Sequence, residues 1–401
     1  MILPIIAFLA LFAITSVAAA ETWKNVNAPG YGDVNNEETH AFTVFRKDLY
    51  AGTQNLATGT EIFKYDGKTW SQINVDGFGD PDTFESSCLA VYKSDLYVGT
   101  YNWDTGSEVW KYDGLKWTRA NPDGFDDGTD GTHSLAVFAG NLYAGTWNRD
   151  YGTKIYKYDG NAWSQANTDG FGDANNDETH SLTIFGSELY AGTHNAASGS
   201  EVFKFNGTAW TQVNTDGYGD ANNTETSSSA VFKSDLYTGT ENHATGTEIW
   251  KYNGKKWMQV NTDGFGDVMN VGTYSMAIFD SRLYAGTFND TSGTRVYKYD
   301  GKTWTQVNTD GYGDKNDFET AALAVFGSAL YAGTHDETVG TKVWQTKPES
   351  KEQKKEPAKK NTAPKKTSDR LSLGVTIALV LFGFIIVILT IFLLVYFKFK
   401  Q

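Results

Sequence analysis

The 401-residue sequence contains one cysteine and seven prolines, and its acidic residues outnumber its basic ones. With Cys88 alone, disulfides and cysteine-based metal sites within the chain are excluded. Residues 346–401 hold 11 of the 34 basic and 4 of the 48 acidic residues, so the remainder has 23 basic and 44 acidic residues, a formal charge of −21. A surface of this sign repels phosphate backbones, so we expect no nucleic-acid partner.

Helical periodicity is almost absent too, and a repeated segment takes its place. One tryptophan in each copy marks seven units that are 46 or 47 residues apart: Trp23, Trp70, Trp117, Trp163, Trp210, Trp257 and Trp304. A Leu-Tyr-x-Gly-Thr sequence keeps the same step, as at 189–193. Fixed self-similarity of this length is typical of solenoids and propellers.

Each unit contains four short runs rich in aromatic and β-branched residues, such as 181–185, 189–193, 201–205 and 209–214. Runs of this kind predict strands. Asn206-Gly207 separates the third run from the fourth, and predicts a two-residue type I′ hairpin. Four antiparallel strands in each of seven units predict an all-β fold, a seven-bladed β-propeller.

The ends of the repeat array support a closed ring. The array begins with a fourth-strand segment, 22–27, and stops after a third strand, 342–345. The N-terminal strand can therefore complete the last blade, which leaves no open blade edge.

The segment 132–167, THSLAVFAGNLYAGTWNRDYGTKIYKYDGNAWSQAN, resembles a kelch-type repeat of the galactose-oxidase central-domain β-propeller superfamily. His-Ser precedes the first strand, Leu-Tyr and glycine stand on the second, Tyr-Asp ends the third, and tryptophan lies on the fourth. The resemblance covers nearly all of 21–345 and implies a propeller. The double glycine of the family is Ala-Gly-Thr in this chain, so "kelch-like" is the fitting term. Propellers serve many functions, so the resemblance implies no particular activity.

The two ends of the chain differ from the repeats. Residues 1–20 form an apolar run that ends in three alanines, which predicts a signal peptide, with an uncleaved anchor as the alternative. The lysine-rich segment 346–370 lacks core residues and predicts an extracellular stalk. Residues 371–397 carry no charge and predict one transmembrane helix, followed by a cytoplasmic tail at 398–401. The sequence thus predicts a single-pass protein of the cell membrane, with the propeller at 21–345 outside the cell.

In a four-stranded blade, the loop between the second and third strands and the crossover to the next blade emerge on one face, called the loop face below. In this chain both are long and polar, as at 194–200 and 215–226, whereas the turns on the opposite face are minimal. Binding residues commonly lie on loops above a rigid scaffold, so we expect a ligand on the loop face.

The second-to-third loops share an Asn or Asp and a later glycine, but the residues beside that Asn or Asp vary between blades. Aromatic rings stack on sugars and apolar groups, so these loops predict a platform for a glycan or a protein ligand. Packing between blades is an equal alternative for any single ring. The candidate ligand-binding residues are Tyr101, Trp103, Trp147, Tyr151, His194, His243, Phe288 and His335.

The crossovers at 167–178 and 214–225 share Asn-Thr-Asp-Gly-aromatic-Gly-Asp-x-Asn-Asn-x-Glu. Closely spaced carboxylates and amides with glycine turns fit an oxygen-ligated calcium loop, so calcium is a possible cofactor. The alternative is structural, with Asp and Asn capping turns while the aromatic ring fills the gap between blades. The candidate calcium ligands are Asp169, Asp173, Asn175, Glu178, Asp216, Asp220, Asn222 and Glu225.

Catalysis needs a constellation that breaks the repeat symmetry, and the sequence offers none, so we expect no enzyme. His40, His133 and His180 occupy one repeat position, interpreted as a repeated structural hydrogen bond. The sequence therefore predicts a membrane-anchored extracellular propeller that binds a glycan or protein through its loop face. The alternatives are a surface hydrolase or lyase that uses acidic crossover residues, and a structural protein of the cell envelope.

Overall fold

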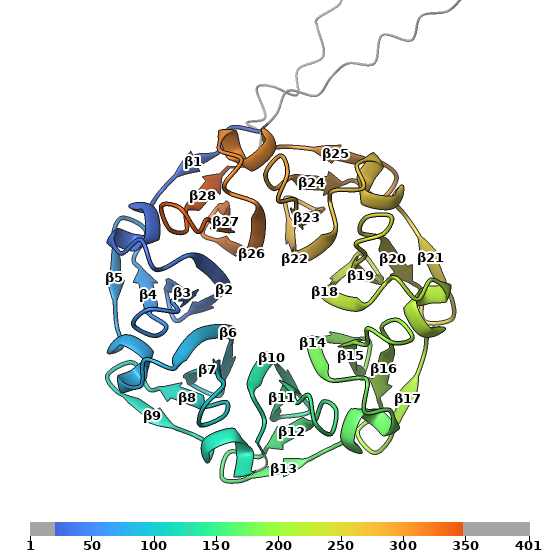
Figure 1. The fold of residues 1–401 in the computed structure, drawn as a ribbon, viewed down its shortest axis with the longest axis horizontal. Helices are drawn as coiled ribbons and strands as arrows, with labels where there is room; N and C mark the ends of the chain where they lie inside the picture. Colours follow the sequence, from blue (N-terminus) through green and yellow to red (C-terminus); the bar gives the residue numbers. More distant parts are fainter. Residues whose placement is uncertain (1–20, 127, 348–401) are drawn as a thin grey trace, which may run out of the picture. The chain divides into compact units, whose positions relative to one another are not determined.

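Seven four-stranded antiparallel blades surround a central channel (Figure 1). The computed structural model describes residues 21–126 and 128–347. In the fourth blade, for example, the chain runs outward from the channel through β14 (Glu178–Phe185), β15 (Glu188–His194), β16 (Val202–Phe205) and β17 (Trp210–Gln212). These strands match the four runs predicted for this unit.

The other blades repeat this order. Their first and second strands are β2 (Glu38–Phe45), β3 (Asp48–Gln54), β6 (Thr83–Tyr92), β7 (Asp95–Asn102), β10 (Gly131–Phe138), β11 (Asn141–Trp147), β18 (Glu225–Phe232), β19 (Asp235–Glu241), β22 (Gly272–Phe279), β23 (Arg282–Phe288), β26 (Glu319–Phe326) and β27 (Ala329–His335). Their third and fourth strands are β4 (Ile62–Tyr65), β5 (Trp70–Gln72), β8 (Val109–Tyr112), β9 (Trp117–Arg119), β12 (Ile155–Tyr158), β13 (Trp163–Gln165), β20 (Ile249–Tyr252), β21 (Trp257–Gln259), β24 (Val296–Tyr299), β25 (Trp304–Gln306), β28 (Val343–Thr346) and β1 (Lys24–Asn25).

A short 3-10 helix lies in each crossover: η1 (Pro29–Gly32), η2 (Asp76–Gly79), η3 (Asp123–Asp126), η4 (Asp169–Gly172), η5 (Asp216–Gly219), η6 (Asp263–Gly266) and η7 (Asp310–Gly313). In η4 the aromatic ring of Phe171 stacks on Phe203, with ring centroids 4.0 Å apart, and meets Trp210 edge-on. The crossover aromatic residue is therefore part of the packing beside the next blade.

The predicted ring closure is confirmed. Strand β1 pairs antiparallel with β28, with Lys24 opposite Gln345 and Asn25 opposite Trp344. The N-terminal segment thus supplies the fourth strand of the last blade, and the propeller has no open outer edge at this point.

The repeated tryptophan joins neighbouring blades. Trp210 Nε1 donates a hydrogen bond to the carbonyl of Ala166, which follows the outer strand of the preceding blade, at 2.9 Å. Equivalent bonds to the preceding blade are made by Trp23, Trp117, Trp163, Trp257 and Trp304. The regular spacing of this tryptophan therefore reflects one contact that recurs in six of the seven blades, since Trp70 Nε1 has no hydrogen-bond partner among the described residues.

Two glycines meet where the second-to-third loop crosses the 3-10 helix. A Cβ added to Gly199 would lie 2.7 Å from Gly217 Cα, and Gly217 N–H donates to the Ser200 carbonyl at 2.8 Å. The loop and the crossover therefore pack directly on one another, which gives the loop face a rigid base.

The predicted two-residue type I′ hairpin between the third and fourth strands is wrong. Phe205 pairs with Trp210, so four residues form the turn, and of Asn206 and Gly207 only the glycine has a positive φ, 97°. The Asn206 side-chain oxygen accepts hydrogen bonds from the backbone N–H groups of Thr208 and Ala209, each at 2.9 Å. Asn-Gly is selected by this side-chain cap rather than by two positive φ angles.

The fold prediction also needs a second correction. The described residues form strands and 3-10 helices only, and none of their helices is long and apolar enough to cross a membrane. The fold of the described chain is therefore all-β, without the predicted transmembrane helix. The segments 1–20, 371–397 and 398–401, and the predicted stalk beyond residue 347, lie outside the described residues.

Gly199→Ala is expected to destabilise the propeller more than Gly207→Ala. Both glycines have a similar positive φ, 94° and 97°, but only Gly199 has neighbouring backbone within 4 Å of an added Cβ. Forced contacts of this kind cost about 1–3 kcal/mol. Melting temperatures measured by differential scanning calorimetry compare the two variants, and equal melting temperatures would contradict the glycine-on-glycine contact.

Candidate functional site

Each innermost strand carries a β-bulge that directs one side chain into the channel. In β14, Thr179 pairs with Thr193 and Ser181 with Gly192, so His180 is left unpaired between them. A bulge re-aims the side chain of its extra residue. The bulge residues of the seven blades line one cavity of about 110 Å³: His40, Ser87, His133, His180, Ser227, Tyr274 and Ala321.

Five buried glutamates stand two residues before these positions, with glycine in the two remaining blades. They are Glu38, Glu85, Glu178, Glu225 and Glu319, and the glycines are Gly131 and Gly272. Because these residues stand at or near the start of the first strands, the glutamates lie toward the loop face. Together with the bulge residues they form the channel ring.

His180 is held in a defined orientation. Its Nδ1 lies 2.8 Å from the carbonyl oxygen of Ser227 in the next blade. Its Nε2 lies 3.7 Å from Glu178 Oε1 and 3.5 Å from Glu225 Oε1. Since a carbonyl only accepts hydrogen bonds, Nδ1 is the protonated nitrogen of the neutral ring, and Nε2 faces the carboxylates.

His40 repeats this arrangement, with Nδ1 3.1 Å from the carbonyl of Ser87 and Nε2 3.4 Å from Glu85 Oε1. His133 differs, because its Nδ1 lies 2.7 Å from Glu178 Oε1. The imidazole rings of His133 and His180 are 5.3 Å apart between centroids. Three histidines from different blades thus converge in the channel, which the interpretation as a repeated structural bond did not foresee.

Burial and neighbouring charges separate the pKa values of the glutamates. Burial raises the pKa of Glu225 well above its usual range, and the charges of Glu241 and Glu178 raise it further. Burial also raises the pKa of Glu178, but the attraction of His133 and His180 outweighs it, so that the net shift is downward. Burial likewise raises the pKa of Glu85, but the attraction of His40 and His133 outweighs it, and the net shift is downward. Negative charge in the channel therefore favours Glu178 and Glu85 over Glu225.

The pKa values of the histidines also diverge. Burial lowers the pKa of His335, but the attraction of Glu38 and Glu319 outweighs this effect and raises the pKa to about 9. For His180 burial again has the largest effect, and despite the attraction of Glu178 its pKa is lowered. Within the channel ring, burial lowers the pKa of His40 but Glu85 and Glu38 raise it to about 9, so the channel ring holds both cationic and neutral imidazoles at neutral pH.

The predicted platform residues divide into two groups. One group lies at or near the ends of the second strands, beside the channel ring, and its side chains are buried or half-buried: Tyr101, Trp147, His194, Phe288 and His335. Trp103, Tyr151 and His243 are exposed on the loops beyond them. The first group is therefore packed within the propeller, whereas the second group stays exposed on the loop face, where ligand contact stays a prediction.

Of the four predicted calcium ligands of the crossover at 167–178, Asp173 and Asn175 lie together, whereas Asp169 and Glu178 contact other residues. Asp173 Oδ1 accepts from the backbone N–H and side-chain amide of Asn175 at 3.0 and 2.9 Å, and Asp169 accepts from Gln165 at 2.6 Å. Glu178 faces the channel ring instead.

The next crossover repeats this arrangement. Asp220 accepts hydrogen bonds from Asn222, and Asp216 accepts one from Gln212. Glu225, like Glu178, faces the channel ring. The crossover aspartates thus accept hydrogen bonds within their turns and from outer strands, and calcium binding by these residues stays a prediction.

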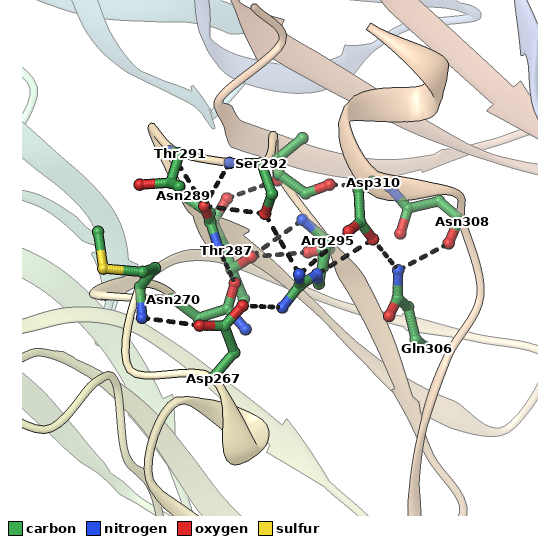
Figure 2. Close-up of polar contacts among 12 residues, drawn as sticks. Asp267, Asn270, Thr287, Asn289, Thr291, Ser292, Arg295, Gln306, Asn308 and Asp310 are labelled. Atoms are coloured by element: carbon green, nitrogen blue, oxygen red, sulfur yellow. Dashed lines mark hydrogen bonds and ion pairs between the residues drawn. The ribbon is translucent and has the colours of Figure 1, made fainter. Parts of the chain in front are cut away.

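In the later blades a basic residue occupies this region (Figure 2). Arg295 Nη1 lies 2.7 Å from Asp267 Oδ2, while its Nε and Nη2 bond the two oxygens of Asp310 at 3.1 and 3.0 Å. In the last blade Lys342 Nζ lies within 3.2 Å of Asp314, Asp317 and Asp336. These carboxylates already have a cationic partner.

Comparison with protein-family models and with curated protein sequences gives no match. Solved β-propellers match the fold. YCF48 from Cyanidioschyzon merolae is 13% identical with a TM-score of 0.55, covering 82% of this chain and 99% of that one. The WD40 β-propeller domain of Doa1 is 9% identical with a TM-score of 0.54, covering 82% and 98%. YCF48 bound to D1 peptide is 13% identical with a TM-score of 0.55, covering 87% and 100%.

These comparisons define the chain as a β-propeller. The narrower kelch-like resemblance to the galactose-oxidase type is not confirmed, because the matched propellers are of the WD40 and YCF48 types. At 9–13% identity the likeness extends to the fold alone.

The sequence carried a signal for the channel ring. Glu-Thr-His occurs at 38–40 and at 178–180, and Glu-Thr opens two further first strands. In a propeller the first strand faces the channel, so a glutamate and a histidine two residues apart indicate a polar channel lining. The bulge, which decides where the histidine points, has no equally clear sequence mark.

His335→Gln is expected to remove part of the pH dependence of stability. The folded-state pKa of His335 is about 9, above its ordinary value of 6.5. The stabilisation from the positive charge of His335 is therefore lost as pH rises through 9. Because burial raises the pKa of Glu38 to about 7, the ion pair with Glu38 is fully charged only between about pH 7 and pH 9. Melting temperatures measured from pH 6 to 10 should show a gap between wild type and variant that narrows toward high pH.

The exposed His243 provides the control for this experiment. His243→Gln should follow the wild-type curve closely, because the His243 side chain is 68% exposed and water screens its ion pair with Glu241. A gap for His335→Gln that stays constant with pH would contradict the assignment of the ion pairs.

Proposed function

We propose that the chain is a non-enzymatic binding module whose loop face takes up a positively charged segment of a protein partner. The observation that carries the proposal is the position of two exposed rings, Trp103 and Tyr151, on neighbouring loops beside the acidic channel ring. Their side chains stay 61% and 59% exposed although both are large and apolar.

The exposed rings stand on a packed base. The Trp103 ring lies 4.6 Å from Phe84 and 5.7 Å from Tyr101, and Tyr101 lies 4.9 Å from Trp147, all between ring centroids. Pre-ordered aromatic side chains lose little conformational entropy on binding and often dominate the binding energy. The surface of Trp103, Trp147 and Tyr151 is called the aromatic surface below.

Charge favours a basic partner. The chain without residues 346–401 has a formal charge of −21, and five buried glutamates lie in the channel ring. The Arg149 guanidinium stands 3.9 Å from the Trp147 ring centroid, so this ring already contacts a cation within the protein. Acidic groups beside aromatic faces attract Lys and Arg side chains through charge and cation–π contacts.

The comparisons support a protein ligand rather than a glycan. One matched structure is described as YCF48 bound to D1 peptide, and this description favours a peptide or protein as the ligand. The proposal places the propeller outside the cytoplasm, on the strength of the signal peptide predicted at residues 1–20.

The double variant Trp103→Ala/Tyr151→Ala is expected to weaken binding of a Lys/Arg-rich peptide. Immobilised 15-residue peptides, one basic and one with Asp/Glu at the same positions, are titrated with the purified full chain by biolayer interferometry. We expect binding to the basic peptide alone, weakened at least about tenfold by the double variant, as loss of an aromatic hot spot implies. Raising the salt concentration should weaken binding of the basic peptide to wild type, because salt screens the attraction between opposite charges.

Leu115→Ala is the matched control, because Leu115 is 92% exposed in a turn on the opposite face. It should bind the basic peptide like wild type. Equal binding of both peptides, or equal losses in the double variant and in Leu115→Ala, would contradict a loop-face site for basic segments.

A further inference from the structure

Below the aromatic surface, the channel ring brings nitrogen and oxygen donor atoms of the third and fourth blades close together. We propose that the channel binds one divalent transition-metal ion of the zinc type through His133, Glu178 and His180. One donor atom from each of these residues lies within 4.8 Å of the others. Zinc bound by His and Glu has metal–ligand distances of about 2.0–2.2 Å, so small side-chain shifts suffice to close the site.

The orientation of His180 suits a metal ligand. Its Nδ1 donates to the Ser227 carbonyl at 2.8 Å, so its Nε2 carries the free lone pair and faces Glu178. Metal-binding histidines commonly donate their other ring N–H to a backbone carbonyl or a carboxylate, which fixes both tautomer and ring direction. The backbone of the fifth blade therefore positions this nitrogen.

Buried donors without hydrogen-bond partners are the second observation. Glu225 Oε1 and His133 Nε2 have no hydrogen bond within the described residues, and Glu178 Oε1 contacts His133 Nδ1 at 2.7 Å without hydrogen-bond geometry. Glu225 is 6% exposed and Glu178 is 9% exposed. Buried polar groups are nearly always satisfied, so a cluster of incompletely satisfied nitrogen and oxygen atoms directed at one another points to a cation-binding site.

The donor set selects the kind of cation. Two imidazoles and one carboxylate suit zinc and other first-row transition metals, whereas calcium takes six to eight oxygen ligands. A third imidazole is close, since the His40 ring centroid lies 6.4 Å from those of His133 and His180. The channel therefore favours a transition metal over calcium, in contrast to the calcium loops that the crossovers suggested.

The repeat itself provides matched substitutions. Serine occupies the bulge position in the second and fifth blades, as Ser87 and Ser227, so His133→Ser and His180→Ser place a residue that this fold already accepts there. Glu178→Gln removes the carboxylate charge with little change in shape. His243→Ser removes an exposed histidine outside the channel ring and is the control.

Isothermal titration of the chelator-treated full chain with ZnCl2 measures the site. We expect one equivalent bound by wild type and by His243→Ser, with affinity at least about tenfold lower in His133→Ser, His180→Ser and Glu178→Gln. Titration with Co²⁺ should give visible absorption that changes in the two histidine variants, because the spectrum reports nitrogen ligands. CaCl2 should give no saturable binding at the same concentrations.

Several outcomes would overturn the proposal: no stoichiometric Zn²⁺ binding by wild type, equal affinity in His180→Ser, or a loss as large in His243→Ser. Circular dichroism and gel filtration show whether each variant keeps the native fold. If a serine variant misfolds, Glu178→Gln and the Co²⁺ spectrum of wild type decide alone. The test is independent of the peptide site, because Trp103→Ala/Tyr151→Ala should bind Zn²⁺ like wild type.

Discussion

The close approach of each blade to the next depends on a glycine in the second strand. A Cβ on Gly192 would lie 2.5 Å from Thr226 Cγ2 of the following blade, so any larger residue would push the two blades apart. The same glycine recurs in every Leu-Tyr-x-Gly-Thr sequence. Because this contact sets the spacing of the blades, it also sets the width of the channel and brings histidines of separate blades within reach of one another.

The functional features arise where individual blades depart from the common frame. The bulge position holds histidine in the first, third and fourth blades, but serine, tyrosine or alanine in the others. At three equivalent positions, blade four has Asn176, Asn195 and Glu201, which form hydrogen bonds. Blade seven has Asp317, Asp336 and Lys342 there, which form ion pairs. The repeat thus supplies a rigid symmetric scaffold, and unequal side chains on it supply the chemistry.

The sequence predicted the architecture well because that architecture follows from periodic features. The tryptophan step gave the number of blades, and the phase of segments 22–27 and 342–345 gave the closure through β1 and β28. The turn at Asn206 was predicted wrongly, because Asn-Gly is typical of two different turns. It occurs in two-residue type I′ hairpins, and it also occurs in longer turns in which the Asn side chain accepts backbone hydrogen bonds, as it does here. The channel ring was missed since a bulge breaks the alternation by which strand faces are assigned.

Because β1 completes the last blade, the propeller closes only when the N-terminal strand β1 pairs with β28 at the other end of the repeat array. The edge of β28 is the one place where a strand must come from some 320 residues away, Lys24 opposite Gln345. Pairing within one molecule competes with exchange of this strand between molecules, as in domain swapping, and effective concentration decides the outcome. The other six blades favour the closed monomer because they hold the N-terminal segment close to β28 of the same molecule. Ring closure therefore also disfavours strand exchange between molecules.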